Sequence, residues 1–226
     1  MISGAGRPER QQAAMESLQR YLVDEKTRLI KLLTPPFDKT PHDPGYIKGY
    51  LPGVRENGAQ YTHAALWSVL ATALQCNGDR AFHLYQMINP LTHSMTPADV
   101  ERYKVEPYVI VADLYTNESH LGRGGWTWYT GSASWMYRVG LEAILGFHKR
   151  GDKLHIEPVI PQAWKEYTIH YQFASSSYEI TVRNPDGVSR GKSTVTVDGK
   201  AIADGGIPLV DDGATHEVVV TLVSGG

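Results

Sequence analysis

The stretch that decides the fold is Tyr167-Thr168-Ile169-His170-Tyr171-Gln172-Phe173, in which large apolar side chains alternate with polar ones. Strict alternation puts the apolar side chains on one face, because successive residues of a β-strand point to opposite sides of a sheet. The same period of two recurs at Ile180 and Val182, at Val195 and Val197, and at Val218, Val220 and Leu222. Asn184-Pro185-Asp186-Gly187 and Asp198-Gly199 are turn signals between these stretches. Together they predict a β-sandwich of about seventy residues.

Upstream of Gly151 the apolar residues follow the period of a helix. A first helix is expected to begin at Pro8 and to end before Pro35-Pro36. The apolar residues assigned to its buried face are Met15, Leu18, Leu22, Leu29 and Leu33. Further helices are expected at about 63–74, between 78 and 90, from 97 onward behind a Thr96 cap, and over 130–147, whereas 106–115 fits a buried helix or a strand. The prediction is an α+β multidomain chain, with one domain over residues 1–150 and a β-domain over 151–226.

Composition excludes several classes of protein. The 226 residues carry a formal charge of −2, which gives no electrostatic reason to expect a nucleic acid as partner. The single cysteine, Cys76, cannot form an internal disulfide, and its place at the end of an apolar helix predicts a buried, inert thiol. We find neither a secretion signal nor an apolar run of the roughly 20 residues that span a bilayer. A cytoplasmic location is therefore expected.

Two polar stretches stand directly before predicted helices, at residues 55–63 and 124–132. Free N–H groups and the helix dipole favour an anion at such positions. The imidazole of His63 and the hydroxyl of Thr130 are hydrogen-bond donors, and Gly131 lets a ligand approach the backbone closely. These three residues together predict a phosphate site.

Each of these residues also has a structural interpretation. Thr130 would then merely cap its helix, His63 would be a structural hydrogen-bonding group, and Glu56 would be a solvated loop charge. The five Trp and thirteen Tyr residues fit ordinary packing as well as stacking on sugar rings. No metal site is predicted, because the nine histidines include no HxH or HExxH arrangement, and no GxSxG, P-loop or Rossmann fingerprint is present.

The sequence resembles one enzyme family at several of these motifs. Glu56-Asn57-Gly58 with His63, and the run Trp128-Tyr129-Thr130-Gly131-Ser132-Ala133-Ser134-Trp135-Met136-Tyr137-Arg138, are similar to the end of the catalytic domain of the inverting phosphorylases. That family includes cellobiose, chitobiose and cellodextrin phosphorylases and the phosphorylase region of cyclic β-1,2-glucan synthases. Residues 103–108 and 154–161 match as well, and residues 2–10 resemble the glucan synthase branch. The resemblance implies the C-terminal helices of an (α/α)6 barrel, followed by a jelly-roll-like β-sandwich.

The resemblance also implies roles for particular residues. His63, Thr130 and Gly131 match positions that hold phosphate, and Glu56 matches a position in the sugar site. We add Tyr61, Trp126 and Trp128 as aromatic walls of the sugar cleft. Inorganic phosphate would be the co-substrate that attacks the anomeric carbon, with no cofactor, while one carboxylic acid protonates the leaving oxygen. In the family that acid is an Asp upstream of the segments seen here, so this chain is expected to hold no catalytic acid and to be inactive alone.

The expected substrate is a β-glucan oligosaccharide, in particular β-1,2-glucan, with glucose 1-phosphate as the product. Expected partners are phosphate, this oligosaccharide and the remainder of the parent polypeptide, which the glucan synthase branch anchors in the inner membrane. Exposed inner faces of an incomplete barrel also predict self-association, for example as a homodimer. Two other functions remain open: a non-catalytic carbohydrate-binding or structural module, and a hydrolase of another (α/α)-barrel family, which would need a paired carboxylate and a water.

Overall fold

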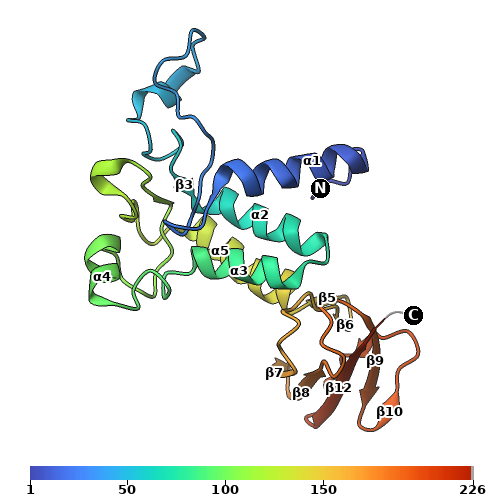
Figure 1. The fold of residues 1–226 in the computed structure, drawn as a ribbon. Coiled ribbons are helices and arrows are strands. Elements are labelled where there is room, and N and C mark those ends of the chain that lie inside the picture. The colour runs from blue at the N-terminus through green and yellow to red at the C-terminus, as the bar shows by residue number, and fades with distance from the viewer. Residues whose placement is uncertain (225–226) are drawn as a thin grey trace. The chain divides into compact units, whose positions relative to one another are not determined.

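A computed structural model describes residues 1–224 and divides the chain into two compact units. One unit consists of residues 1–72 and 83–139 and contains most of the helices; the other consists of residues 73–82 and the chain from Gly140 onward and contains most of the strands (Figure 1). The chain is therefore α+β, as the sequence predicts.

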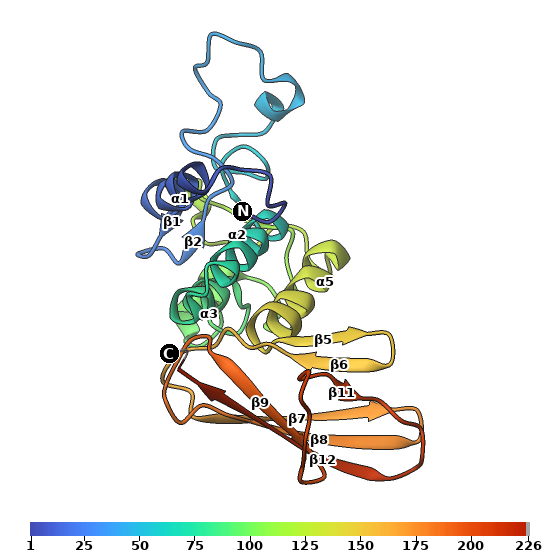
Figure 2. The same ribbon diagram turned by 90° about the vertical axis from the view of Figure 1, so that its right-hand side faces the viewer.

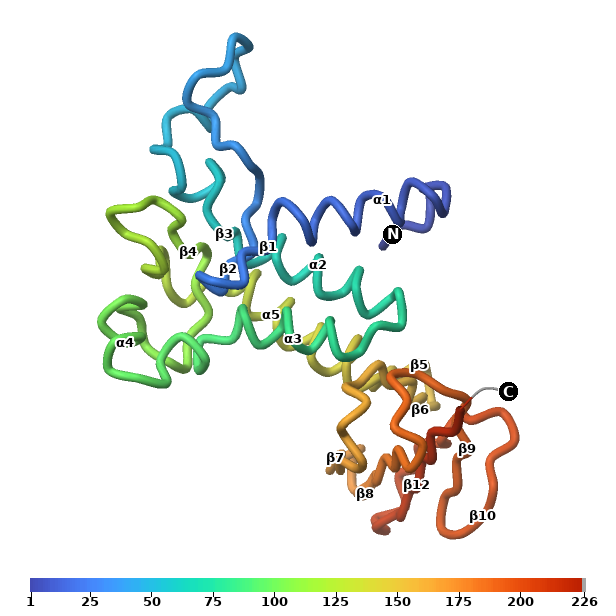
Figure 3. The backbone as a smooth tube through the Cα atoms, viewed as in Figure 1, coloured from blue at the N-terminus to red at the C-terminus, as the bar shows by residue number. Residues whose placement is uncertain are grey.

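Residues 1–144, which include the whole helical unit, form short elements, many of them separated by long loops. In chain order these are α1 (Pro8–Ser17), the π-helical turn η1 (Leu18–Leu22), β1 (Val23–Asp24), β2 (Leu29–Ile30), the 3₁₀ helix η2 (Gly45–Gly49), β3 (Gln60–Tyr61), α2 (Thr62–Leu74), α3 (Gly78–Ile88), α4 (Pro97–Tyr103), β4 (Asp113–Leu114), the 3₁₀ helix η3 (Glu118–His120) and α5 (Thr130–Arg138), which continues as the π-helical turn η4 (Val139–Ile144). Figure 3 traces the long segment between β2 and β3, which extends away from the helices.

The predicted helices α2, α3 and α4 are confirmed. Thr96 caps α4: its Oγ1 accepts a hydrogen bond from the backbone N–H of Asp99 at 3.1 Å, and Pro97 follows at the first helical position. The last predicted helix, 130–147, is correct at its start. It ends sooner, because Gly146 adopts the left-handed φ of 75° and Phe147 already belongs to a strand.

The prediction of one long first helix is wrong for its second half. α1 ends at Ser17, one π-helical turn follows, and the predicted face residues Leu29 and Leu33 lie outside the helix. The side chain of Asp24 accepts a hydrogen bond from the N–H of Thr27 and forms a turn, after which Leu29 and Ile30 form a buried strand. The N–H of Ile30 donates to the side chain of Gln60 at 2.8 Å. A tertiary hydrogen bond thus overrides the helical spacing of the leucines.

Cys76 is exposed, so the prediction of a buried thiol is wrong. It lies past the end of α2 with φ 60°, in a turn in which its N–H donates to the carbonyl of Ala73, so its side chain leaves the apolar face of the helix. Its Sγ is 3.4 Å from Nη1 of Arg190.

The second unit contains two β-sheets, which lie one beside the other in Figure 2. The strands are β5 (Phe147–Arg150), β6 (Lys153–Ile156), β7 (Glu166–Phe173), β8 (Ser176–Arg183), β9 (Lys192–Val197), β10 (Lys200–Ala201), β11 (Ile207–Pro208) and β12 (Thr215–Val223). Their order is β11-β6-β5 in one sheet and β10-β9-β12-β8-β7 in the other, where β12 and β8 run parallel.

The predicted alternation in this unit is confirmed. Ile180 and Val182 of β8 pair with Val218 and Val220 of β12, and all four side chains are buried on the same face. The turn at Asp198-Gly199 joins β9 to β10, as its sequence predicts.

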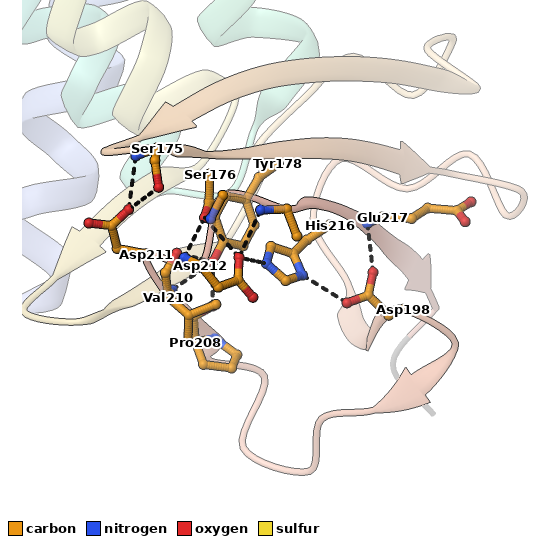
Figure 4. Close-up of polar contacts among 12 residues, drawn as sticks. Ser175, Ser176, Tyr178, Asp198, Pro208, Val210, Asp211, Asp212, His216 and Glu217 are labelled. Atoms are coloured by element: carbon orange, nitrogen blue, oxygen red, sulfur yellow. Dashed lines mark hydrogen bonds and ion pairs between the residues drawn. The ribbon is translucent and has the colours of Figure 1, made fainter.

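A polar cluster holds the start of β12 against the neighbouring turns (Figure 4). The imidazole of His216 lies between two carboxylates, with Nδ1 2.8 Å from Asp198 and Nε2 3.3 Å from Asp212. Ser176 joins the cluster by donating to Asp212 at 2.9 Å. A neutral imidazole has one N–H, so hydrogen bonds to both carboxylates require the imidazolium form.

We predict that His216 titrates above the ordinary histidine value of about 6.5. The hydrogen bond to Asp198, and then that to Asp212, raises its pKa. The cationic ring therefore stabilises the fold fully below pH about 6.5, and this stabilisation is lost as the pH rises through the raised pKa. Proton NMR titration of the imidazole should show a lower pKa in Asp198→Asn and no change in Asp204→Asn, whose carboxylate pairs with Lys153. An unchanged His216 pKa in Asp198→Asn would contradict the assignment.

We also predict that Gly146 is needed for the connection between η4 and β5. A Cβ at this position would lie 2.2 Å from the carbonyl carbon of Glu157, and φ is 75°. Gly146→Ala should lower the free energy of unfolding by about 2–5 kcal/mol, as the sum of left-handed strain and overpacking. Gly151→Ala is the matched control, because Gly151 has φ 63° but no atom within 4 Å of the added Cβ, and it should cost only about 1–2 kcal/mol. Equal losses in urea unfolding would show that the contact with Glu157 does not matter.

Candidate functional site

Strand β4 joins the two polar stretches that the sequence singles out. On one side it pairs with β3, with Tyr61 opposite Asp113. On the other side Leu114 bridges to Gly124, and the N–H of Ala112 donates to the carbonyl of Trp126 at 2.7 Å. The segment 106–115, which the sequence left undecided, therefore lies between the loops 55–63 and 124–132.

Helices α2 and α5 begin where these two loops end. The ring of His63, in the first turn of α2, lies 5.7 Å from the ring of Trp135 in α5. A Cβ on Gly131 would lie 3.9 Å from Nδ1 of His63, so the first turn of α5 faces the imidazole. The two predicted halves of the phosphate site are thus brought together.

Thr130 is the first residue of α5, not its cap. The N-cap is Tyr129, which makes no side-chain capping hydrogen bond, and the Thr130 side chain is exposed. The interpretation of Thr130 as a capping residue is therefore wrong. The first-turn N–H groups of a helix have no partner within the helix, so they point out beside this exposed hydroxyl.

Three polar atoms near the two helix starts are buried and lack a hydrogen-bond partner among the described residues: Nε2 of His63, Oγ1 of Thr62 and Oγ of Ser132. Buried polar groups in folded proteins nearly always have a partner. Nε2 of His63 therefore makes none of the contacts that a structural histidine would make, and its ring instead packs against Trp67 at 4.9 Å. Unsatisfied donors at a pair of helix N-termini favour a polar ligand or ordered water there.

Glu56 lies in the loop before α2, beside Arg55. Its carboxylate is 3.7 Å from Nε of Arg55, and both side chains are about one-fifth exposed, so Glu56 is not a solvated surface charge. The guanidinium of Arg55 also covers the ring of Trp126 at 4.2 Å. Glu56 and Trp126, both predicted for the sugar site, are therefore connected through Arg55.

The side chain of Tyr61 forms a hydrogen bond with a tyrosine that the sequence did not predict as a site residue. Its hydroxyl is 3.1 Å from that of Tyr129. This hydrogen bond, burial and the nearby Glu56 raise the pKa of Tyr61 to about 12, so the phenol stays neutral. Two neutral hydroxyls that share one hydrogen bond leave the second proton free to donate to a ligand.

Asp113 is the main residue that sequence reasoning missed. Its side chain is 1% exposed, and its Oδ2 accepts a hydrogen bond from the backbone N–H of Arg55 at 3.1 Å. Gly125 lies against Oδ1, where even a Cβ would not fit. Burial raises the pKa of Asp113. The sequence signal was a carboxylate directly after the apolar run 109–112, but only strand pairing shows what it contacts.

The tryptophans predicted as cleft walls, Trp126 and Trp128, are both exposed. The structure also has a hollow of about 680 Å³ beside the segment 33–40 and an adjoining one of about 450 Å³. Neither of these two hollows is lined by a predicted site residue. Among residues 1–224, no cluster of three His, Cys, Asp or Glu side chains is arranged to hold a metal, and no helix has the length and apolarity needed to cross a membrane.

Comparison with known proteins gives the family. Residues 1–146 match the catalytic domain of the glycosyl hydrolase 94 superfamily, and residues 147–202 match the C-terminal domain of glycosyl hydrolase family 65. The chain belongs to the glycosyl hydrolase 94 superfamily. All the candidate site residues lie in the part that matches the superfamily's catalytic domain.

The relatives that the chain matches include a glucan synthase and several phosphorylases, and the chain covers a different share of each. The chain is 51% identical, over 80% of its length, to 6% of the cyclic β-(1,2)-glucan synthase NdvB of Rhizobium meliloti. It is 31% identical, over 98% of its length, to 27% of an N,N′-diacetylchitobiose phosphorylase of Vibrio furnissii, and 30% identical, over 98%, to 28% of a solabiose phosphorylase of Paenibacillus borealis. The chain therefore spans less than a third of each of these relatives. The resemblance noted in the sequence is confirmed.

We predict that Asp113 fixes the two loops of the site. Asp113→Ala should lower the free energy of unfolding by about 1–3 kcal/mol, because the N–H of Arg55 loses a buried acceptor. Asp113→Asn keeps an oxygen for that N–H and should lose less than half as much. Urea unfolding of both variants gives the comparison; equal losses would show that the hydrogen bond to Arg55 contributes nothing.

Proposed function

We propose that this chain provides the phosphate site and part of the sugar site of an inverting β-glucan phosphorylase or glycosyltransferase. The observation that carries the proposal is that Nδ1 of His63 faces Gly131 in the first turn of α5, while Nε2 of the same ring and Oγ of Ser132 are buried without a partner among the described residues. The substrate would be a β-1,2-glucan and the product glucose 1-phosphate, in keeping with the 51% identity to a cyclic β-(1,2)-glucan synthase.

The proposed architecture is that of the resemblance. The helices up to about residue 150 would be the last helices of an (α/α)6 barrel, and residues 151–226 a jelly-roll-like β-sandwich. The loop-rich helical unit and the two sheets of the second unit support this arrangement. The cytoplasmic location, the absence of a cofactor and self-association stay predictions from the sequence.

The role proposed for these residues is to position the phosphate and the sugar. An inverting phosphorylase holds phosphate against the sugar so that it attacks the anomeric carbon from the side opposite the leaving group. The hydroxyl of Thr130, the first-turn N–H groups of α5 and the imidazole of His63 would hold the phosphate oxygens. Glu56 would accept hydrogen bonds from sugar hydroxyls through the part of its carboxylate side chain that stays exposed, about one-fifth, beside Arg55.

Protonation of the leaving oxygen is assigned to a carboxylic acid outside these 226 residues, so the chain alone is proposed to be inactive. A hydrolase would instead need a carboxylate pair with a water between them. Asp113 and Glu56 are close enough to interact electrostatically, but Asp113 is buried against Gly125 and cannot reach a substrate. A non-catalytic sugar-binding module would bind glucan without regard to phosphate.

The proposal is tested by titrating the purified chain with inorganic phosphate and measuring binding through the chemical shift changes of its backbone amides. We expect the amides of 130–132 to shift on titration with inorganic phosphate, and His63→Ala to weaken binding about tenfold, as expected for loss of a charge-assisted hydrogen bond. His120→Ala, an exposed histidine in η3, is the control and should bind as the unaltered chain does. Gly131→Ala should fold normally, because its Cβ meets only ordinary contacts at 3.9 Å, yet bind phosphate more weakly by filling the space toward His63. Phosphate binding that is the same in all variants would refute the proposal.

A further inference from the structure

Trp128 is held in a conformation that its own side chain disfavours. Its φ is 58°, in the left-handed region that bulky residues rarely enter. Hydrogen bonds fix the backbone on both sides: the carbonyl of Trp126 accepts from the N–H of Ala112 at 2.7 Å, and the N–H of Tyr129 donates to the carbonyl of Ile110 at 3.1 Å. The loop is therefore rigid at the point where it is strained.

This strain does not bury the indole. The Trp128 side chain is 66% exposed, and the ring that it meets, Tyr108, is 73% exposed. The two rings are 6.1 Å apart and 70° from parallel, an edge-to-face pair. Such a pair uses at most one face of one ring, so the other ring faces stay open to solvent. A glycine would satisfy the backbone at Trp128 without strain, and burial does not explain the tryptophan.

We propose that Tyr108 and Trp128 form an aromatic platform that stacks on a pyranose ring of a β-glucan chain, outside the proposed phosphate site. This rests on the proposed function and adds Tyr108 as a residue that selects longer chains. An apolar sugar face lies flat on an aromatic ring, and rigid rings bind at low entropic cost. The platform is continuous with the site, because Trp128 is in the loop that leads directly to Thr130 and Gly131.

The sugar binding proposed for this platform does not depend on a charged side chain. The neighbouring tryptophan, Trp126, has the guanidinium of Arg55 over its ring, which makes that ring part of the polar side of the site. Trp128 meets a second aromatic ring instead. An uncharged pair of open ring faces fits a neutral sugar better than an anion.

The experiment is an NMR titration of the ¹⁵N-labelled 226-residue chain that follows the indole N–H signals of the tryptophans. The ligands are a linear β-1,2-glucopentaose and the disaccharide sophorose. We expect the Trp128 signal, assigned by its loss in Trp128→Gly, to shift with the pentaose and to shift less with sophorose. Tyr108→Ala and Trp128→Gly should each weaken pentaose binding at least about fivefold through lost apolar contact. Tyr137→Ala is the control, because Tyr137 is 69% exposed on α5 and should leave binding unchanged.

Stability separates a structural role from a binding role. Trp128→Gly removes the left-handed strain, so its unfolding midpoint should be equal to or higher than that of the unaltered chain while pentaose binding falls. A lower midpoint, or pentaose binding unaffected by both variants, would overturn the platform. If phosphate still binds at His63 but the Trp128 indole signal does not shift with the pentaose, only the platform is rejected. A Trp128 response without any phosphate binding rejects the proposed phosphate site and leaves the platform standing.

Discussion

The site depends on the pairing of one short segment, residues 110–114, with two others: β3, which is far from it in sequence, and the loop 124–129, which follows it closely in the chain. This segment hydrogen-bonds to β3 on one side and to the loop 124–129 on the other. Because β3 leads directly into α2 and that loop leads directly into α5, the pairing fixes where both helices begin. The meeting of His63 with Gly131 follows from this, as does the bond between Tyr61 and Tyr129.

The same pairing explains why a carboxylate is buried here. Asp113 is opposite Tyr61 in the ladder, and its side chain fills the space between Arg55 and Gly125. Burial disfavours its charged form, and the backbone N–H of Arg55 compensates only in part. Buried polar groups of this kind cost stability but define one arrangement of the surrounding loops.

Sequence patterns predicted the elements whose side chains repeat regularly. The alternation in 167–173 and in the later strands, the Thr96 cap and the starts of α2, α3 and α5 all follow from local periodicity and capping chemistry. The same reasoning failed for Leu29 and Leu33, where helical spacing continued by coincidence past a turn made by Asp24. It also failed for Cys76, since burial of a residue at a helix end depends on the side to which the chain turns.

The sequence by itself determined that the chain is α+β, that it resembles a phosphorylase family, and that His63, Thr130 and Gly131 stand at helix starts. These are local properties, set by side-chain chemistry and by positions along the chain. Only the tertiary structure decided that the two helix starts face each other, that Asp113 is buried behind Arg55, and that Trp128 is strained yet exposed. Contacts between residues fifty or more positions apart depend on strand pairing, which a single sequence does not encode as a readable pattern.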